Sequence, residues 1–363
     1  MTPASWYIHV PFCASVCPYC DFFRTVPSAA RIEQWLDVVG AEIRSRLEPD
    51  TKIDTLYIGG GTPSVLSDSQ FFRLVKDLLP HLHAQSEVTV ECNPESLSAQ
   101  KLAMYRQCKV NRISLGVQSF NAKTIEKLGR HHTPALIEQA VEAIKEAGID
   151  NISIDLMFAV PGQSMADVQA DLARFFRLDI AHLSIYSLIL EEGSVFGRQG
   201  LQAVDEDLEA DEYEWIVQTM KAHGYCHYEI SSFARDGKLS RHNLAYWLDQ
   251  DFVGIGCGAS GRENRRRYTN APDLLEYIEK GPRPEYEPVN APFEAVMMGL
   301  RTCFGVDLAS FFEKYGLRLE EMAAPLLAKY DGDLMVERGA LKTTESGMEK
   351  LNSILVDFLA LFE

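Results

Sequence analysis

Short apolar runs alternate along the chain with longer segments whose apolar residues recur every three or four positions. The apolar runs cover residues 6–10, 53–58, 88–92, 113–117, 152–160 and 182–190. Runs of this kind are typical of strands in a parallel sheet that is covered by helices. The segments with helical spacing cover residues 32–47, 68–82, 102–108, 124–147 and 165–178. The pattern predicts an α/β fold in which strand and helix alternate six times.

Two architectures fit this alternation. Six units that close part way form an open, TIM-like partial (β/α)6 barrel. A doubly wound open sheet has the same periodicity, so the pattern alone does not decide between them. We expect the barrel or sheet domain to cover residues 1–235, with a strand at 228–233. A further helix is expected from residue 204, acidic to residue 214 and continued by a buried side with Trp215, Ile216 and Met220.

The pattern changes near residue 291, where shorter helical segments begin. Helical spacing is present at residues 293–301, 307–315, 319–330 and 347–362, and residues 332–344 resemble a hairpin. Helices with a hairpin predict a small winged-helix-like domain at residues 291–363. Residues 236–290 are then a connecting segment. Because the chain is acidic, this domain is expected to be a lid or partner surface and not a DNA reader.

Three cysteines stand together directly after the first apolar run. Cys13, Cys17 and Cys20 are separated by three and then two residues. Three thiolates at this spacing can hold a four-iron cluster and leave one iron open for chemistry. A zinc site or inert buried thiols are the alternatives. Zinc prefers paired cysteines or a histidine partner, and no second pair follows at zinc spacing, so the loop favours a [4Fe-4S] cluster.

Polar residues and glycines recur where the later strands end. They are Gly59, Gly60, Gly61 and Thr62 after the second strand, Glu91 and Asn93 at the third, Gln118 and Ser119 at the fourth, Asp155 inside the fifth and, near the end of the sixth, Tyr186 and Ile189. In a barrel of this class the chemistry lies on loops at the C-terminal ends of the strands, so these residues are expected to face one opening. The glycine-rich loop is neither a dinucleotide nor a P-loop fingerprint, but glycines let a backbone approach a ligand closely.

The composition narrows the class of partner. A formal net charge of −17 argues against a general nucleic-acid binder and against adhesion to anionic lipid. No apolar run approaches the ~18 residues needed to span a bilayer, and the first residues lack signal-peptide or transit-peptide character. The eight cysteines are not spaced as a disulfide framework. We therefore expect a cytoplasmic protein.

The string Tyr7-x-His-x-Pro-Phe-Cys-x3-Cys-Pro-Tyr-Cys-Asp-Phe resembles the radical-SAM family, and within it the coproporphyrinogen-oxidase-like branch. The resemblance covers nearly the whole chain. It implies the partial (β/α)6 barrel, and a cluster whose open iron chelates S-adenosylmethionine. It also implies a cofactor pocket formed by Tyr7, Tyr19, Gly60, Gly61, Thr62, Glu91, Gln118, Arg130, Asp155 and Ile189.

A second motif runs from Arg241 to Trp247 and contains His242, an asparagine and two aromatic residues. Taken alone it predicts a packed turn with a hydrogen-bonded histidine. It also resembles the motif associated with heme binding in this branch, and imidazole is a natural axial ligand of heme iron. His242 is therefore a candidate heme contact.

Two functions follow from the resemblance. One is a heme carrier that delivers heme to a recipient, expected to be a respiratory protein. The other is an oxygen-independent coproporphyrinogen III oxidase, which uses a deoxyadenosyl radical for oxidative decarboxylation. The decarboxylase has a fourth cysteine where this chain has Phe22, and a long extension before the loop, where this chain has twelve residues. The carrier is favoured. The retained pocket leaves catalysis open, and a methyltransferase or other radical enzyme on the same barrel is a third, weaker alternative.

Overall fold

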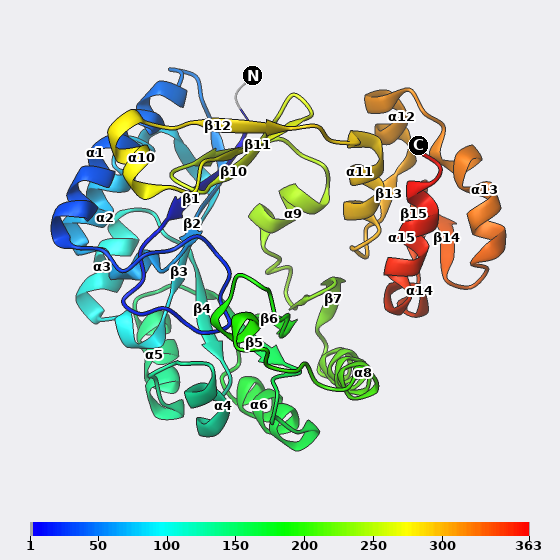
Figure 1. Cartoon of the computed structure of the whole chain (residues 1–363), viewed down its shortest axis with the longest axis horizontal. Coiled ribbons are helices and arrows are strands. Elements are labelled where there is room, and N and C mark those ends of the chain that lie inside the picture. The colour runs from blue at the N-terminus through cyan, green and yellow to red at the C-terminus, as the bar shows by residue number, and fades with distance from the viewer. Residues whose placement is uncertain (1–2, 363) are drawn as a thin grey trace.

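The computed structural model describes residues 3–362, and a large mixed sheet organises most of them (Figure 1). Six parallel strands at its centre follow one another in sequence order. They are β1 (Ser5–Val10), β2 (Ile53–Gly60), β3 (Leu82–Cys92), β4 (Arg112–Gln118), β5 (Asn151–Phe158) and β6 (His182–Ser187). Parallel neighbours need a crossover after each strand, and helices supply it. The predicted alternation of strand and helix is confirmed.

The crossover helices lie on the outer side of the curved sheet (Figure 1). They are α1 (Ala29–Arg46), α2 (Asp68–Val75), α3 (Ala99–Gln107), α4 (Ala122–Lys127), α5 (Pro134–Glu146) and α6 (Met165–Arg177). The side chains of Ser28, Ser67 and Thr133 accept backbone N–H groups of the first turns and so fix where these helices begin. The buried faces pack with strand residues such as Trp6 and Ile113 into one core. Further along follow a short helix α7 (Val195–Arg198) and the longer α8 (Glu206–Ala222).

Antiparallel strands complete both ends of the sheet, which therefore stays open. At one end β6 pairs with β8 (Ser232–Ala234), and β8 pairs with β7 (Cys226–Glu229). At the other end β1 pairs in parallel with a late strand, and three antiparallel strands follow. These four are β9 (Phe252–Ile255), β10 (Ser260–Glu263), β11 (Arg266–Asn270) and β12 (Pro284–Glu287). The open, partial barrel is the architecture that the resemblance implied.

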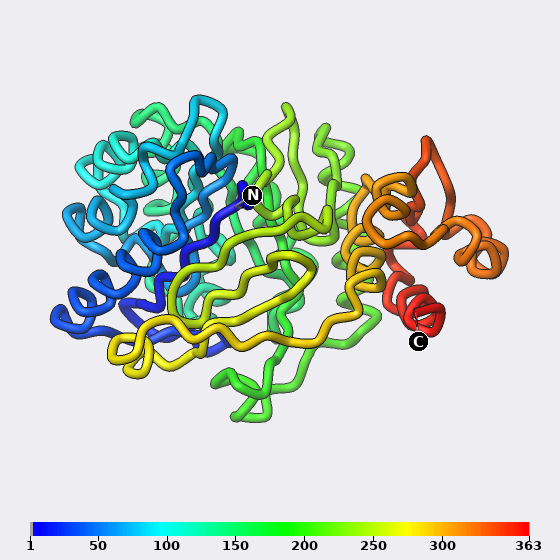
Figure 2. Tube along the Cα trace, turned by 90° about the horizontal axis from the view of Figure 1, so that it is seen from above, coloured from blue at the N-terminus to red at the C-terminus, as the bar shows by residue number. Residues whose placement is uncertain are grey.

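Residues 236–290 do more than connect two domains, because β9 to β12 belong to the main sheet. This segment also forms α9 (Arg241–Trp247) and α10 (Leu274–Lys280). Figure 2 shows its later part, in yellow, running along the barrel before the chain enters the C-terminal domain. α9 lies between β1 and β2 on one side and the C-terminal domain on the other (Figure 1).

The C-terminal domain has a hydrophobic core of its own, which includes Val296, Phe311, Leu341 and Phe358. A three-stranded sheet in the order β13–β15–β14 packs there with helices. The elements are α11 (Ala291–Gly299), β13 (Val306–Asp307), α12 (Leu308–Tyr315), α13 (Leu319–Lys329), β14 (Leu334–Glu337), β15 (Ala340–Thr343), α14 (Glu345–Glu349) and α15 (Leu351–Leu359). The expected hairpin is the β14–β15 pair. The last helix is divided at Lys350 instead of running unbroken.

Several boundaries differ from the pattern-based prediction, and three of them are instructive. The helix expected to reach residue 82 ends at Val75, and a 3-10 turn containing Pro80 leads into β3 at Leu82. Proline has no N–H to continue a helix. β3 begins six residues earlier than expected because its first half is polar on the exposed side. The strand expected at 228–233 is a tight hairpin between β7 and β8, with Ile230 and Ser231 between the two strands.

Candidate functional site

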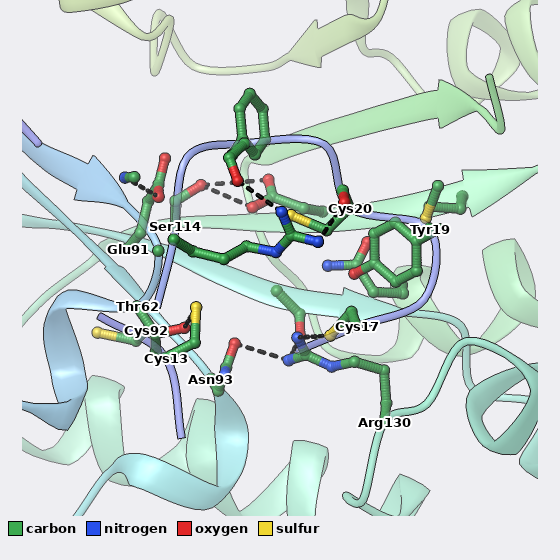
Figure 3. A pocket seen from close by; sticks show the side chains of 18 of the residues that line it. Cys13, Cys17, Tyr19, Cys20, Thr62, Glu91, Cys92, Asn93, Ser114 and Arg130 are labelled. Atoms are coloured by element: carbon green, nitrogen blue, oxygen red, sulfur yellow. Dashed lines mark hydrogen bonds between the residues drawn. The ribbon is translucent and has the colours of Figure 1, made fainter. Parts of the chain in front are cut away.

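A cavity of about 570 Å³ opens at the C-terminal ends of the parallel strands, beside the loop that follows β1 (Figure 3). Most residues predicted for the site line it together. These are Cys13, Cys17, Tyr19, Cys20, Gly60, Gly61, Thr62, Glu91, Gln118, Arg130, Asp155, Tyr186 and Ile189. The expectation that the strand ends share one opening is therefore confirmed. The roles of these residues toward a ligand stay predictions.

The three cysteines lie on the loop between β1 and α1. A backbone hydrogen bond from Cys13 to Thr25, 3.0 Å long, closes this loop at its base. The thiol of Cys13 is buried, and those of Cys17 and Cys20 are half-buried. Burial raises the pKa of the Cys13 and Cys20 thiols, so iron binding would displace protons from them.

The surroundings of these thiols fit a cluster held by three thiolates. Within residues 3–362 no three His, Cys, Asp or Glu side chains converge on a single metal position. A cubane does not require such convergence, because each thiolate binds a different iron. Gly61 faces the loop so closely that a Cβ there would lie 2.6 Å from the Phe12 carbonyl oxygen and 3.0 Å from Cys13 Sγ. The chain thus keeps this position free of a side chain beside the thiols.

Glu91 fixes the glycine loop after β2. Its carboxylate accepts a hydrogen bond from the Gly60 N–H at 3.0 Å and another from the Tyr57 hydroxyl at 2.8 Å. Gly60 has φ +110°, which favours glycine. Burial raises the pKa of Glu91 to about 7, although both hydrogen bonds and Arg112 oppose the shift. The carboxyl group can therefore bind as an acceptor or as a proton donor near neutral pH.

Two further charged groups face the cavity, Arg130 from the loop between α4 and α5 and Asp155 from β5. Arg130 donates to Asn93 Oδ1 at 2.6 Å and to the Gly116 carbonyl at 3.0 Å, and its Nη1 lies 3.7 Å from Cys17 Sγ. Asp155 accepts from the Ser114 hydroxyl at 3.0 Å, and burial raises its pKa to about 6. The cavity thus offers a cation beside the thiols and a carboxyl group deeper in the barrel.

Two predicted contacts, Tyr7 and His242, are not among the residues that line the cavity. Both lie behind Tyr57, which does line it. The rings of Tyr57 and His242 stack with centroids 5.2 Å apart, and the Tyr7 ring is 6.1 Å from Tyr57. The Tyr7 hydroxyl is hydrogen-bonded to His9 Nδ1 at 3.0 Å. In this conformation Tyr7 and His242 support the wall and do not form its surface.

His242 is completely buried, and both of its ring nitrogens have partners. Nδ1 is 2.8 Å from Thr55 Oγ1, and Nε2 is 2.5 Å from the Tyr246 hydroxyl. Burial lowers the pKa of His242 to about 3, so the ring is neutral. The sequence-based alternative of a packed, hydrogen-bonded histidine describes this state.

Sequence reasoning missed several lining residues, of which Arg112 stands out. Its side chain is buried, it lines the cavity, and its Nε has no hydrogen-bond partner. The sequence did contain an indication that Arg112 faces the cavity. Polar residues and a glycine occupy every second position of this strand, and all of them line the cavity: Arg112, Ser114, Gly116 and Gln118. Alternate residues of a strand share one face, so the polar set marks the inner face of β4. Tyr57 was also missed as a lining residue, whereas Asn93, expected at the end of the third strand, does line the cavity.

Comparison with known families agrees with this geometry. Residues 7–175 match the Radical SAM superfamily, and residues 286–349 match the HemN C-terminal domain. Among solved structures, coproporphyrinogen III oxidase (HemN) from Escherichia coli superposes with a TM-score of 0.84. The match covers 98% of this chain and 90% of that chain at 23% identity, and it shows a common fold. The fold and the domain matches define a radical-SAM protein with a HemN-type C-terminal domain.

Full-length relatives narrow the class further. The heme chaperone HemW of Lactococcus lactis is 37% identical, with 98% of this chain and 97% of that protein covered. The corresponding proteins of Bacillus subtilis and Escherichia coli K12 are 36% and 34% identical. They cover 95% and 99% of this chain, and 94% and 99% of their own lengths. The chain belongs to the HemW family. In residues 3–362, no helix has both the length and the apolar character needed to cross a bilayer.

Proposed function

We propose that the chain binds heme, holds a [4Fe-4S] cluster and S-adenosylmethionine, and delivers the heme to a recipient protein. The observation that carries the proposal is full-length similarity to proteins named heme chaperone HemW. Phe22 supports it, because the decarboxylase resemblance calls for a cysteine at that position. We further propose a respiratory protein as recipient, a cytoplasmic location and no nucleic-acid partner.

Cys13, Cys17 and Cys20 would hold the cluster, which with S-adenosylmethionine supplies radical chemistry when bound. The chain's own residues would hold the second cofactor. Gly60, Gly61 and Thr62 expose backbone groups at the cavity wall, and Glu91 offers an acceptor beside them. Gln118, Asp155, Tyr19 and Ile189 complete the wall, and Arg130 supplies a cation for a carboxylate. Tyr7 would act from behind Tyr57 by supporting that ring.

A specific observation keeps a second function in view. The cavity retains its polar lining, including Arg112 and Arg130 with unpartnered Nε atoms. Buried donors without partners favour a site that binds a polar ligand. The second candidate is therefore oxidative decarboxylation of coproporphyrinogen with S-adenosylmethionine.

A hemin titration beside a turnover assay separates the two candidates. Wild-type protein, reconstituted anaerobically, should shift the Soret band of added hemin, and His242→Ala should bind at least tenfold more weakly. The exposed His223 provides the matched control, because His223→Ala should titrate like the wild type. Absence of a Soret shift in the wild type contradicts the heme proposal. Turnover of coproporphyrinogen with S-adenosylmethionine and a reductant would place the second candidate first.

A further inference from the structure

We propose that the C-terminal domain is a latch that keeps His242 closed off while it is docked, and that its release opens the heme site. This inference rests on the proposed function, because it describes how that site is regulated. The starting observation is that the surroundings of His242 do not allow the contact proposed for it. The histidine proposed to contact heme is completely buried and fully hydrogen-bonded.

The seal around His242 comes from α9 itself and from the barrel. The backbone N–H of His242 donates to Glu87 Oε1 at 3.0 Å, which fixes the start of α9 against β3. One turn later Tyr246 covers Nε2. The Tyr246 ring packs edge-on against Phe252, with centroids 4.4 Å apart. An iron atom needs a free ring nitrogen, so α9 must shift before His242 can bind heme.

α9 is held on its outer side by the C-terminal domain. It packs against β1 and β2 on one side and against α11 on the other, as Figure 1 shows. A layer between two domains cannot move outward unless the second domain moves as well. Displacement of α9 is therefore coupled to undocking of residues 291–362.

A charged cluster fastens the two domains just beyond the end of α9. Asp249 lies two residues after α9 and is paired with Arg262 of β10. From the C-terminal domain, Lys314 Nζ lies 2.6 Å from Asp249 Oδ2 and 2.6 Å from the Asp249 carbonyl oxygen. The Tyr315 hydroxyl donates to the same carboxylate at 2.7 Å. One carboxylate thus links the segment after α9, the barrel and α12.

The contacts of Asp249 with Lys314 and Tyr315 can be broken while both domains stay folded. Each domain has its own cluster of buried residues, and among the described barrel residues only Ile230, in the β7–β8 hairpin, packs against the C-terminal core. The C-terminal domain can therefore tilt away at α12 and keep both cores, with the hairpin as its remaining point of contact. Asp249 neutralises two cations that come from different domains. Without its charge, Arg262 and Lys314 would face each other across the interface and repel. Two backbone hydrogen bonds at the β7–β8 hairpin, from the Cys303 N–H to the Tyr228 carbonyl at 3.0 Å and from the Ile230 N–H to the Arg301 carbonyl at 3.2 Å, would remain as a pivot. The exposed ion pair Lys221–Glu345 and the partly exposed pair Arg267–Glu294 also join the two domains, and pairs of this kind contribute little to stability.

Chemical modification of His242 tests the latch without heme. Diethyl pyrocarbonate acylates neutral, accessible imidazole, and mass spectrometry reports the rate at each histidine. Asp249→Asn should raise the rate at His242 at least tenfold. The buried His182 should stay unreactive and serve as an internal reference for intact folding. Lys314→Gln removes the same contact from the other domain, and it carries the test if Asp249→Asn does not fold.

The chain provides a matched control inside the C-terminal domain. There Asp357 is paired with Lys329 and with the Tyr330 hydroxyl, the same three residue types as in the latch. Asp357→Asn should leave the His242 rate within twofold of the wild type. An unchanged His242 rate in both latch variants, with His182 protected, overturns the latch.

Hemin association rates then test whether undocking of the C-terminal domain controls heme binding at His242. The association rate of hemin should rise in Asp249→Asn in proportion to the rate of His242 modification. If His242 becomes reactive while hemin associates at the wild-type rate, the latch does not regulate heme binding, and this inference is wrong. Failure of hemin to bind any variant is a different result, because it contradicts the proposed function, while the modification rates still decide whether α9 is latched.

Discussion

The cavity wall and helix α9 both contain buried polar residues, but these residues differ in whether all of their polar atoms have hydrogen-bond partners. In the cavity, the guanidinium groups of Arg112 and Arg130 each keep an unpartnered nitrogen. In α9, both ring nitrogens and the backbone N–H of His242 are bonded. Buried donors without partners mark a site that a ligand completes, whereas a saturated residue must first lose its partners. The cavity is arranged so that a polar ligand could complete it, whereas α9 would have to rearrange before His242 could bind one.

The pKa shifts in the two regions show that their difference in hydrogen bonding does not come from a difference in desolvation. Burial raises the pKa of Glu91 to about 7 and lowers that of His242 to about 3. Both shifts favour the neutral form, because burial disfavours charge of either sign. The regions therefore differ in their hydrogen-bond partners and not in how strongly they are desolvated.

Replacing a thiol in the cavity should have the largest effect. Cys17→Ser should reduce the iron content after anaerobic reconstitution from about four per chain to near zero, because two remaining thiolates cannot hold the cluster. Metal analysis and the visible spectrum measure this. Cys226→Ser, which changes an exposed cysteine outside the cavity, should keep the full iron content. Retention of iron by Cys17→Ser would mean that the cavity is not the cluster site.

The pH dependence of stability tests the protonation state of Glu91 in the cavity. Between about pH 4.5 and 7 the folded chain keeps a proton on Glu91 that the unfolded chain releases, so stability falls as the pH rises through this window. Glu91→Gln removes this dependence. From pH 5 to pH 8 it should lose about 2 kcal/mol less free energy of unfolding than the wild type, as measured by urea denaturation. Equal losses would show that Glu91 is already ionised in the folded chain at pH 5.

Removing the Tyr246 hydroxyl tests whether the hydrogen bond to His242 stabilises the fold, and this change should have the smallest effect. Tyr246→Phe leaves His242 Nε2 without its partner and should lower the free energy of unfolding by about 1 kcal/mol. The matched control is Tyr286→Phe at an exposed position, which should be close to neutral. If both variants unfold at the same urea concentration as the wild type, the Tyr246 hydroxyl does not seal His242.

Local patterns were sufficient to predict the parallel core and most of the cavity. A strand, its C-terminal end and the loop after it are contiguous in sequence, so the positions of Cys13, Glu91 and Asp155 followed from the strand pattern. Arg112 was missed because, apart from Asp155, only residues at the C-terminal strand ends were considered, and Arg112 is the first residue of β4. Its place at every second position with Ser114 and Gly116 shows that the inner face of β4 also carries polar residues.

The placement of α9 could not be predicted because it depends on distant contacts. His242 is held by Thr55 and Glu87, which lie more than 150 residues before it. No periodicity reports such a contact. For the same reason a motif of seven residues gave no sign that it would be packed between a sheet and a second domain. The role of residues 252–287 in extending the sheet was missed because β1 pairs with β9, a strand that begins only at Phe252.

The pairing of β1 with β9 also affects how the chain is made on the ribosome. β1 ends at Val10 and β9 ends at Ile255, so one edge of β1 lacks its neighbour until the later segment has been synthesised. At roughly 5–20 residues per second this interval lasts on the order of tens of seconds. An unpaired edge strand is a template for aggregation. The strand that leads into the cysteine loop is therefore the part of the nascent chain most in need of protection, and chains that stop before residue 252 should aggregate through it.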